Sequence, residues 1–348
     1  MVIVEWEGDG AIGELRFEPQ ADAYSVDQAT QPTYHAWMTH RIHVDTDFAG
    51  DPDDACALAM LLGDESADIT GVTTTLEDGG HRHDCVRALL EMAGRTDIPS
   101  AAGFGRTLTN RAFTCTWDDR VHWPSPPPQA PTPPGAALDL LSEAIESEAT
   151  ILAIGGFTNL ACLELARPGS LRDARIVAMA GWVEDPPATF PQWGAEMDFN
   201  TQSDTTSALI VAEAAERFTL VTMPVAMQAT LKGMHLERLR DAGPVGELLA
   251  QQSEANRDTS GFDSLGLQFD GLPDDLVNFH WDPVAAGVAL EWDCVTLRSS
   301  QIQAFGNDGV VEFSESGNGA GAITVSIDAA AFEERWLRSV EALHSPQR

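Results

Sequence analysis

Five aspartates fall within ten positions of the stretch HVDTDFAGDPDDACAL, residues 43–58: Asp45, Asp47, Asp51, Asp53 and Asp54. Carboxylates this close repel one another, so they cannot all stay ionised without a cation or strong hydrogen bonds. Oxygen ligands of this kind suit hard cations such as Ca²⁺ or Mg²⁺. The stretch therefore predicts a cation site, and the plainer alternative is a helix N-cap within a solvated acidic loop.

A phosphatase-type DxD turn is a second chemistry that this stretch could carry. That chemistry favours a lysine close to the phosphate, and Lys232 is the one lysine of the chain. A metal-dependent phosphatase is therefore the weaker interpretation.

Short β-branched runs alternate with helical patterns from residue 41 onward. The predicted strands are 41–45, 68–74, 150–154, 174–180 and 218–222. The predicted helices are 54–62, 82–92, 136–146, 158–166, 205–215 and 283–290. This alternation predicts an α/β fold, a Rossmann-like open, mainly parallel sheet with helices on both faces. Ligands of such sheets bind at the carboxyl ends of the strands, where the aspartates lie.

Other segments depart from this alternation. Residues 1–37 carry no clear helix period, so we expect an N-terminal extension that is either disordered or upstream of a true start at Met38. Residues 38–348 are predicted to form a single catalytic domain. Within it, 123–135 reads as a Pro-rich loop and 229–279 as an insertion of helices and loops. GVVEF and GAITVSID, after residue 308, read as a pair of strands before a terminal helix, 329–343.

The net charge of −34 bounds the partners of the protein. A surface this acidic repels nucleic acid and anionic membranes. Acid excess with a single lysine favours a halophilic, acidic proteome, in which high salt screens the self-repulsion. The five scattered cysteines form no CxxC pair, which indicates a reducing compartment. No apolar run approaches the roughly 18 residues of a membrane span and no signal peptide is visible, so a cytoplasmic protein is predicted.

Four stretches, in order, resemble the inosine–uridine-preferring nucleoside hydrolases. They are DTDFAGDPDDACAL, with two extra residues between DxD and DD, ILAIGGFTNLA at 151–161, MDFNTQSDTTSA at 197–208 and FHWDPVAAGVAL at 279–290. Together they span about residues 41–345. The resemblance implies the nucleoside hydrolase fold and Ca²⁺-dependent hydrolysis of the N-glycosidic bond of ribonucleosides to ribose and free base. It also implies a homo-oligomer, a dimer or a tetramer.

The resemblance assigns a role to each matching residue. The Ca²⁺ ligands would be the side chains of Asp47, Asp54 and Asp282 and the backbone carbonyl of Ile154. Asp47 would also act as general base toward the attacking water, and Asp45 would hold the loop by hydrogen bonding.

Ribose would be recognised by Asp53, Asn200 and Asp282. Asp198 occupies the place of a glutamate that usually contacts the 5′-hydroxyl, and Asp78 occupies the place of a common asparagine. The plainer readings are a turn residue for Asn200, a loop charge for Asp78 and an N-cap for Asp198.

The leaving base needs stabilisation as well. One branch of the family has a histidine directly before the last metal aspartate, whereas a purine-preferring branch has a tryptophan there that stacks on the base. Trp281 holds this place and predicts stacking, with Phe199 as a second wall. His280 is the rival acid, with a core position as its alternative. Four further tryptophans in predicted loops are candidates to cover the pocket: Trp117, Trp123, Trp182 and Trp193.

A non-catalytic nucleoside- or ribose-binding protein that retains the Ca²⁺ site is the alternative function. Asp198, Asp78 and the missing histidine motivate it, since each departs from the pattern of the family.

Overall fold

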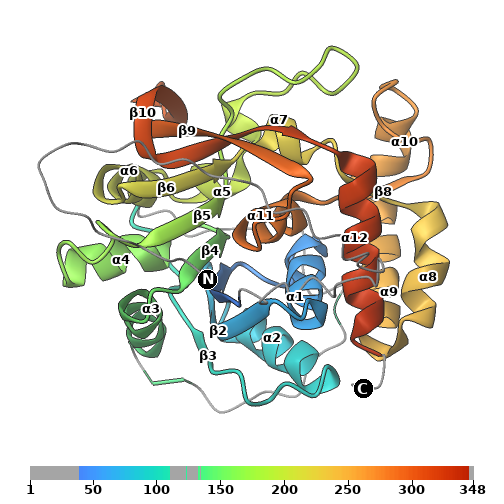
Figure 1. The fold of residues 1–348 in the computed structure, drawn as a ribbon, viewed down its shortest axis with the longest axis horizontal. Helices are drawn as coiled ribbons and strands as arrows, with labels where there is room; N and C mark the ends of the chain where they lie inside the picture. The colour runs from blue at the N-terminus through green and yellow to red at the C-terminus, as the bar shows by residue number, and fades with distance from the viewer. Residues whose placement is uncertain (1–38, 110–122, 124–131, 134, 345–348) are drawn as a thin grey trace, which may run out of the picture. The chain divides into compact units, whose positions relative to one another are not determined.

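The computed structural model describes residues 39–109, 123, 132–133 and 135–344 (Figure 1). The predicted extension over residues 1–37 and most of the Pro-rich loop lie outside these residues. So does Trp117.

An eight-stranded sheet forms the centre of the fold, in the order β3-β2-β1-β4-β5-β6-β10-β9. All neighbouring strands run parallel except β9, which pairs antiparallel with β10. The strands are β1 (His40–Thr46), β2 (Ala67–Thr74), β3 (Ser100–Ala102), β4 (Thr150–Ile154), β5 (Arg175–Met179), β6 (Arg217–Val221), β9 (Val295–Asn307) and β10 (Val310–Ile327). The predicted mainly parallel sheet is confirmed.

Helices cover both faces of the sheet (Figure 1). The longer helices are α1 (Asp53–Gly63), α2 (His81–Met92), α3 (Ala136–Glu146), α4 (Thr158–Ala166), α6 (Thr205–Ala214), α9 (Gly243–Ser260), α11 (Trp281–Ala289) and α12 (Ala329–Ala342). The shorter ones are α5 (Phe199–Ser203), α7 (Met223–Ala226), α8 (Leu236–Asp241) and α10 (Phe262–Gly266), with 3₁₀ turns η2 (Ala195–Met197) and η3 (Gly233–His235). None of the described helices is both long and apolar enough to cross a membrane.

Each face has its own hydrophobic core. Side chains of α1, α2, α9, α11 and α12 build one core, and side chains of α3, α4 and α6 build the other. β1 lies between them, and its last five residues are all buried. A central parallel strand is covered on both faces, so the polar His43 and Asp45 are buried as fully as the apolar Ile42 and Val44 with which they alternate.

The C-terminal helix closes the first of these cores. Trp336 of α12 is fully buried, and its indole Nε1 donates a hydrogen bond to the carbonyl oxygen of Cys56 in α1 at 3.1 Å. α1 also packs against α11. The first helix of the described chain is therefore held by the last two.

The predicted pair of strands after residue 308 is wrong. GVVEF and GAITVSID belong almost entirely to one strand, β10, which pairs antiparallel with β9 and parallel with β6. The pairing register shifts between Ser316 and Gly321, in a glycine-rich stretch that interrupts the strand pattern of the sequence. The segment 229–279 contains η3, α8, α9 and α10 between two short strands, β7 (Thr230–Lys232) and β8 (Leu276–Phe279), which pair antiparallel with each other.

Candidate active site

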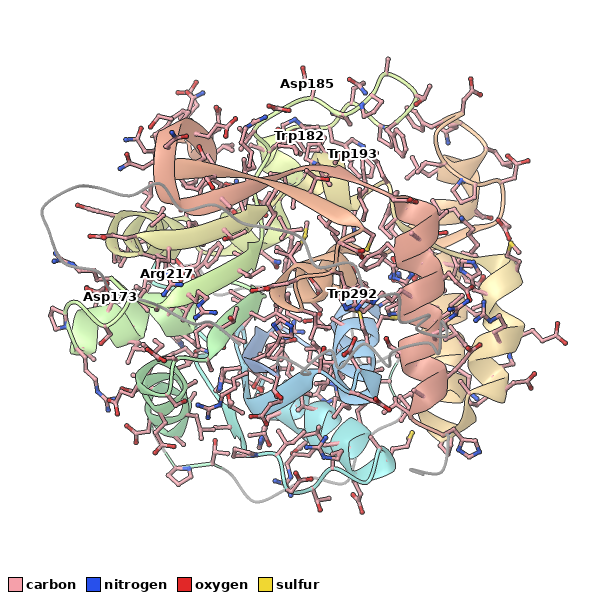
Figure 2. The ribbon with its side chains drawn as sticks, in the orientation of Figure 1. Asp173, Trp182, Asp185, Trp193, Arg217 and Trp292 are labelled. Atoms are coloured by element: carbon pink, nitrogen blue, oxygen red, sulfur yellow. The ribbon has the colours of Figure 1, made fainter. Side chains whose placement is uncertain are left out.

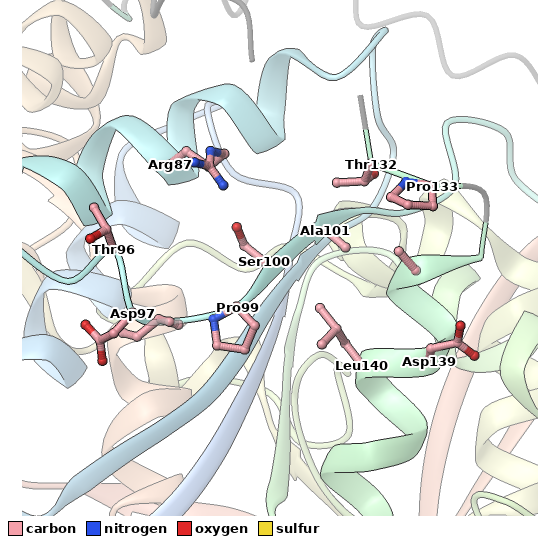
Figure 3. Close-up of a pocket in the computed structure, with 12 residues that line it drawn as sticks. Arg87, Thr96, Asp97, Pro99, Ser100, Ala101, Thr132, Pro133, Asp139 and Leu140 are labelled. Atoms are coloured by element: carbon pink, nitrogen blue, oxygen red, sulfur yellow. The ribbon is translucent and has the colours of Figure 1, made fainter. Parts of the chain in front are cut away.

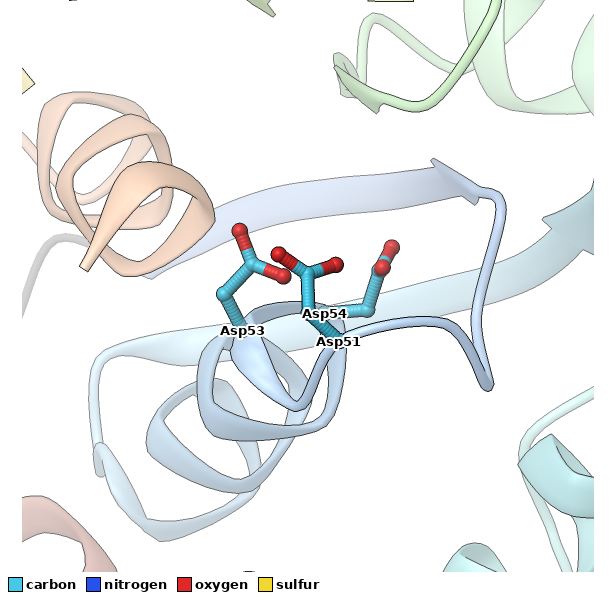
Figure 4. A group of neighbouring side chains, drawn as sticks. All are labelled: Asp51, Asp53 and Asp54. Atoms are coloured by element: carbon cyan, nitrogen blue, oxygen red, sulfur yellow. The ribbon is translucent and has the colours of Figure 1, made fainter. Parts of the chain in front are cut away.

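The turn between β1 and α1 gathers three carboxylates. Asp53 and Asp54 occupy the first turn of α1, and Asp51 lies just before the helix. Oxygen atoms of these three side chains all lie within 4.8 Å of one another, and Figure 4 shows the carboxylates together above the start of the helix. Asp53 and Asp54 are buried. This turn follows β1, so the group lies at the carboxyl edge of the sheet.

Two further aspartates complete this group. Asp47 follows the last residue of β1, and Asp282 lies in the first turn of α11. Burial raises the pKa of Asp282, and the charges of the four loop aspartates raise it further. The fold therefore brings Asp282 beside residues that are remote from it in the sequence. We call Asp47, Asp51, Asp53, Asp54 and Asp282 the aspartate group.

The aspartate group has the character of a cation site. Burial, followed by repulsion from neighbouring carboxylates, raises the pKa values of Asp53 and Asp54 well above the ordinary value. Within the described residues, Asp53 Oδ1 and Thr75 Oγ1 are buried without a hydrogen-bond partner. A set of hard oxygen atoms, partly unpartnered and mutually repelling, fits a divalent cation of the Ca²⁺ or Mg²⁺ type.

The end of β4 approaches this group through its backbone. Ile154 is the last residue of β4 and pairs with Thr46 of β1. A Cβ atom on the next residue, Gly155, would lie 2.6 Å from the Asp47 nitrogen, so only glycine lets the two turns approach this closely. The structure thus brings the backbone around Ile154 against the Asp47 loop.

Asp45 lies behind the group in a buried hydrogen-bond network. Its Oδ1 accepts hydrogen bonds from Thr73 Oγ1 at 2.6 Å and from Asn159 Nδ2 at 2.7 Å. Asn159 Nδ2 also donates to the Thr74 carbonyl, and its Oδ1 accepts from the Phe104 backbone N–H. Asn159 thereby links the ends of the neighbouring strands. Burial, the largest cause, raises the pKa of Asp45 to about 7.

The segment after β5 presents the residues that the resemblance assigns to ribose. Asp198 caps α5: it is buried, accepts from the Thr201 backbone N–H and hydroxyl, and accepts from the Gly181 N–H at 2.7 Å. Asn200 Nδ2 donates to the Met179 carbonyl at 3.0 Å, at the carboxyl end of β5. Phe199 is 38% exposed. Asp198 thus performs the capping role of its plainer reading, and the contact to the 5′-hydroxyl stays a prediction.

Aromatic rings surround Trp281 at the start of α11. Its ring centroid lies 4.7 Å from that of Phe279 and 6.5 Å from that of Trp193. Figure 2 shows Trp182 and Trp193 in the same region as the loop that carries Asp185. Trp182 and Trp281 both pack against the core that includes α1, and also against a smaller buried cluster of Met227, Leu272, Leu276 and Phe279. Trp123, by contrast, is buried 5.0 Å from Phe48, so it belongs to the core.

The sequence pattern of one family, described as inosine-uridine preferring nucleoside hydrolase, matches residues 42–334. The chain belongs to this family. The match includes most of β1, the whole aspartate group and Trp281, so the predicted resemblance is confirmed.

Individual relatives of this nucleoside hydrolase family match over less of the chain. A probable uridine nucleosidase 2 of Arabidopsis thaliana is 32% identical over 158 residues, which cover 40% of this chain and 47% of that protein. An uncharacterised protein of Schizosaccharomyces pombe is 31% identical over 155 residues, 40% of this chain and 48% of its own length. The chain thus spans about half the length of the curated relatives it matches.

Solved nucleoside hydrolases share the fold over nearly their full length. A plant nucleoside hydrolase superposes with a TM-score of 0.71 at 20% identity, covering 88% of this chain and 99% of that one. The purine-preferring ribonucleoside hydrolase from Gardnerella vaginalis gives the same TM-score at 18% identity, covering 87% and 99%. These likenesses confirm the nucleoside hydrolase fold.

Asp78 differs from the aspartate group in its exposure to solvent. Asp78 lies in the turn between β2 and α2 and is exposed, which agrees with its plainer reading as a loop charge.

A hollow of about 520 Å³ lies between α2, β3 and α3, and its lining includes Arg87, Asp97, Ser100 and Asp139 (Figure 3). No member of the aspartate group lines this hollow, so it is not the predicted ribose site.

His280 lies in the core on the side of α12. It is 1% exposed, its ring centroid is 4.3 Å from that of Trp336, and burial lowers its pKa to about 3. Within the described residues its Nε2 has no hydrogen-bond partner. Trp281, the next residue, contacts Trp193 and Phe279 instead. These contacts favour the core position over the acid for His280.

We therefore expect His280→Ala to affect stability more than chemistry. The loss of a buried ring beside Trp336 lowers the free energy of unfolding by about 2–4 kcal/mol, while kcat below the melting temperature changes by less than about threefold. Chemical denaturation and ribose release measure the two effects. A variant that melts normally but has lost about a hundredfold in kcat would instead make His280 the acid.

Proposed function

We propose that this protein is a Ca²⁺-dependent ribonucleoside N-ribohydrolase. One observation carries the proposal: in a chain of this family, five aspartates, four from one turn and one from α11, converge at the carboxyl edge of the sheet, and all of them except the half-buried Asp51 are buried. Buried charge of this density is costly without a function. The family and the oxygen ligands together favour hydrolysis of an N-glycosidic bond.

The reaction adds the oxygen of water to C1′ of the ribose and breaks the bond from C1′ to the base nitrogen. The base leaves with the bonding electron pair and takes up a proton. Asp47, at the mouth of the turn and 9% exposed, removes a proton from the attacking water. Its charged neighbours stabilise the positive charge that develops on the ribose in an oxocarbenium-like transition state.

Asp47, Asp54, Asp282 and the Ile154 carbonyl would hold the cation. When bound, Ca²⁺ supplies positive charge that neutralises these carboxylates and binds hydroxyl and water oxygen atoms. Asp53, Asp282 and Asn200 would accept or donate hydrogen bonds to the ribose hydroxyls. Thr73 and Asn159 both donate to the Asp45 Oδ1, so the role of Asp45 would be to hold the turn.

Trp281 would face the leaving base. A purine ring can stack on an indole with an attraction that grows as the base gains charge or a proton. Trp193 adjoins Trp281, so the second wall of the base site would come from the 182–198 loop as well as from Phe199. This arrangement favours purines over pyrimidines as leaving groups.

The first test is the release of free reducing sugar from inosine, adenosine, guanosine, uridine and cytidine. We expect release in high KCl with Ca²⁺, loss of release with EDTA, and faster turnover of the purine nucleosides. Nucleosides that raise the melting temperature but yield no ribose would replace the hydrolase with the non-catalytic binder. The cytoplasmic location, the halophilic adaptation and the dimeric or tetrameric state stay predictions.

A further inference from the structure

A buried arginine outside the aspartate group connects the two turns that surround it. Arg82 lies in the first turn of α2 and is 5% exposed. Its Nη1 donates to the Phe48 carbonyl at 2.8 Å and to the Asp47 carbonyl. Its Nε donates to the Leu76 carbonyl at 3.0 Å. One guanidinium thus binds the backbone of the β1–α1 turn and of the β2–α2 turn at the same time.

Both turns carry a residue at positive φ, either at a carbonyl that Arg82 binds or directly after one. Leu76 has φ = 50°, and Ala49, directly after Phe48, has φ = 75°. Residues other than glycine adopt such φ angles at a cost of about 1–3 kcal/mol, and they keep them only where the surrounding structure holds the backbone. Ala49 also belongs to the stretch in which this sequence carries two extra residues between Asp47 and Asp53.

The start of α2 is itself fixed, so the guanidinium has a firm support. Glu77 Oε1 accepts hydrogen bonds from the Thr74 hydroxyl and from the His83 N–H, and Oε2 accepts from the Gly80 N–H. Arg82 can therefore hold the longer turn against α2. A planar guanidinium with donors in a fixed fork suits three carbonyl acceptors, whereas a lysine is a single point donor on a flexible stem.

We propose that Arg82 is a positioning residue, which fixes the backbone of the 46–53 turn so that Asp47 and Asp54 keep the geometry of the cation site. The proposal rests on the proposed function for its link to Ca²⁺, but its first step concerns the turn alone. Arg82 contacts the backbone of Asp47 and acts on the reaction only through that residue.

The test compares Arg82→Met with Arg87→Met, a matched variant of an exposed arginine on the same helix. Amide hydrogen exchange of residues 46–53 in cation-free full-length protein reports the turn directly. Ca²⁺ titration calorimetry reports the site, and kcat and KM report the reaction. We expect Arg82→Met to speed exchange of the turn by about tenfold or more and to weaken Ca²⁺ binding by a similar factor. Arg87→Met should match the wild type in both.

Arg82→Lys keeps the positive charge but loses the forked arrangement of donors. We therefore expect an amide exchange rate of the turn and a Ca²⁺ affinity between those of the wild type and Arg82→Met. If Arg82→Met does not fold, Arg82→Lys tests the proposal in its place. An Arg82→Met variant that melts at a lower temperature but keeps the exchange and the Ca²⁺ affinity of Arg87→Met would overturn the proposal, since Arg82 would then be merely structural. Wild-type values in Arg82→Lys would overturn it too. A wild-type protein that neither binds Ca²⁺ nor releases ribose refutes the proposed function, while the exchange comparison still decides whether Arg82 fixes the turn.

Discussion

Asp47→Ala should lower kcat for ribose release by about a hundredfold or more, because the substitution removes a general base and a cation ligand together. Asp47→Asn separates the two roles. It keeps an oxygen that can bind a cation but cannot take up a proton, so its kcat should fall while its Ca²⁺ affinity falls less. The measurements are ribose release under saturating nucleoside and Ca²⁺ titration of each variant.

Asp139→Ala is the matched control for the loss of one carboxylate. Asp139 is exposed, pairs with Arg167 and lines the hollow beside α3 rather than the aspartate group. It should leave kcat unchanged. If Asp47→Ala kept wild-type kcat, or if Asp139→Ala lost activity to the same extent, the assignment of the reaction to the β1–α1 turn would be wrong.

Removal of the cation should destabilise the protein, and more so at higher pH. Burial raises the pKa of Asp45 from its ordinary 3.8 to about 7, and raises those of Asp53, Asp54 and Asp282. For a carboxyl group with a raised pKa, the native state binds more protons than the unfolded state. For Asp45 this contribution to stability is complete below pH 3.8 and is lost as the pH rises toward 7; Asp53, Asp54 and Asp282 lose theirs in the same direction.

Ca²⁺ would replace the protons of the ligands Asp54 and Asp282, whose pKa values are raised, so its stabilising effect should grow as the pH rises. We expect saturating Ca²⁺ to raise the melting temperature by about 5–10 °C at pH 7.5, and by much less at pH 5. Buried His43 and His280, whose pKa values burial lowers to about 3, act in the opposite direction, since they lose stability as the pH falls below 6.5. The effects of these two histidines on stability cancel when Ca²⁺-loaded and cation-free protein are compared at the same pH.

Thermal melts with Ca²⁺ or EDTA, at matched ionic strength in KCl, measure this difference. Equal shifts at the two pH values would contradict the assignment of the buried carboxylates to a cation site. The matched ionic strength matters because screening alone stabilises a chain with a net charge of −34.

The order of strands and helices was predictable where local pattern and burial agree. β1, β4 and the helices α3 and α4 follow from apolar runs and periodicity that no distant contact alters. The pairing of β9 with β10 was not predictable from local pattern. Glycines interrupt β10 in the sequence, although it is a single long strand, and its antiparallel partner β9 precedes it across a turn. The two apolar runs of β10, GVVEF and GAITVSID, therefore resemble two paired strands in the sequence.

The aspartates were predictable for a similar reason, since four of them are adjacent in sequence and Asp282 belongs to a recognisable stretch. Arg82 and Asn159 were not. Arg82 reads as an ordinary polar residue of a helix, and two of its three carbonyl acceptors, Asp47 and Phe48, are remote in sequence. Asn159 belongs to the stretch ILAIGGFTNLA, but only the fold shows that it donates a hydrogen bond to Asp45. Backbone acceptors leave no trace in side-chain identity.

The position of α12 bears on how the protein is made. The ribosome delivers the four loop aspartates early and Asp282 late, and the tryptophan that anchors α1 through the Cys56 carbonyl comes later still. During translation these acidic side chains must therefore stay in water until the C-terminal helices emerge. The aspartate group is therefore complete only after α11 has been synthesised and folded against α1.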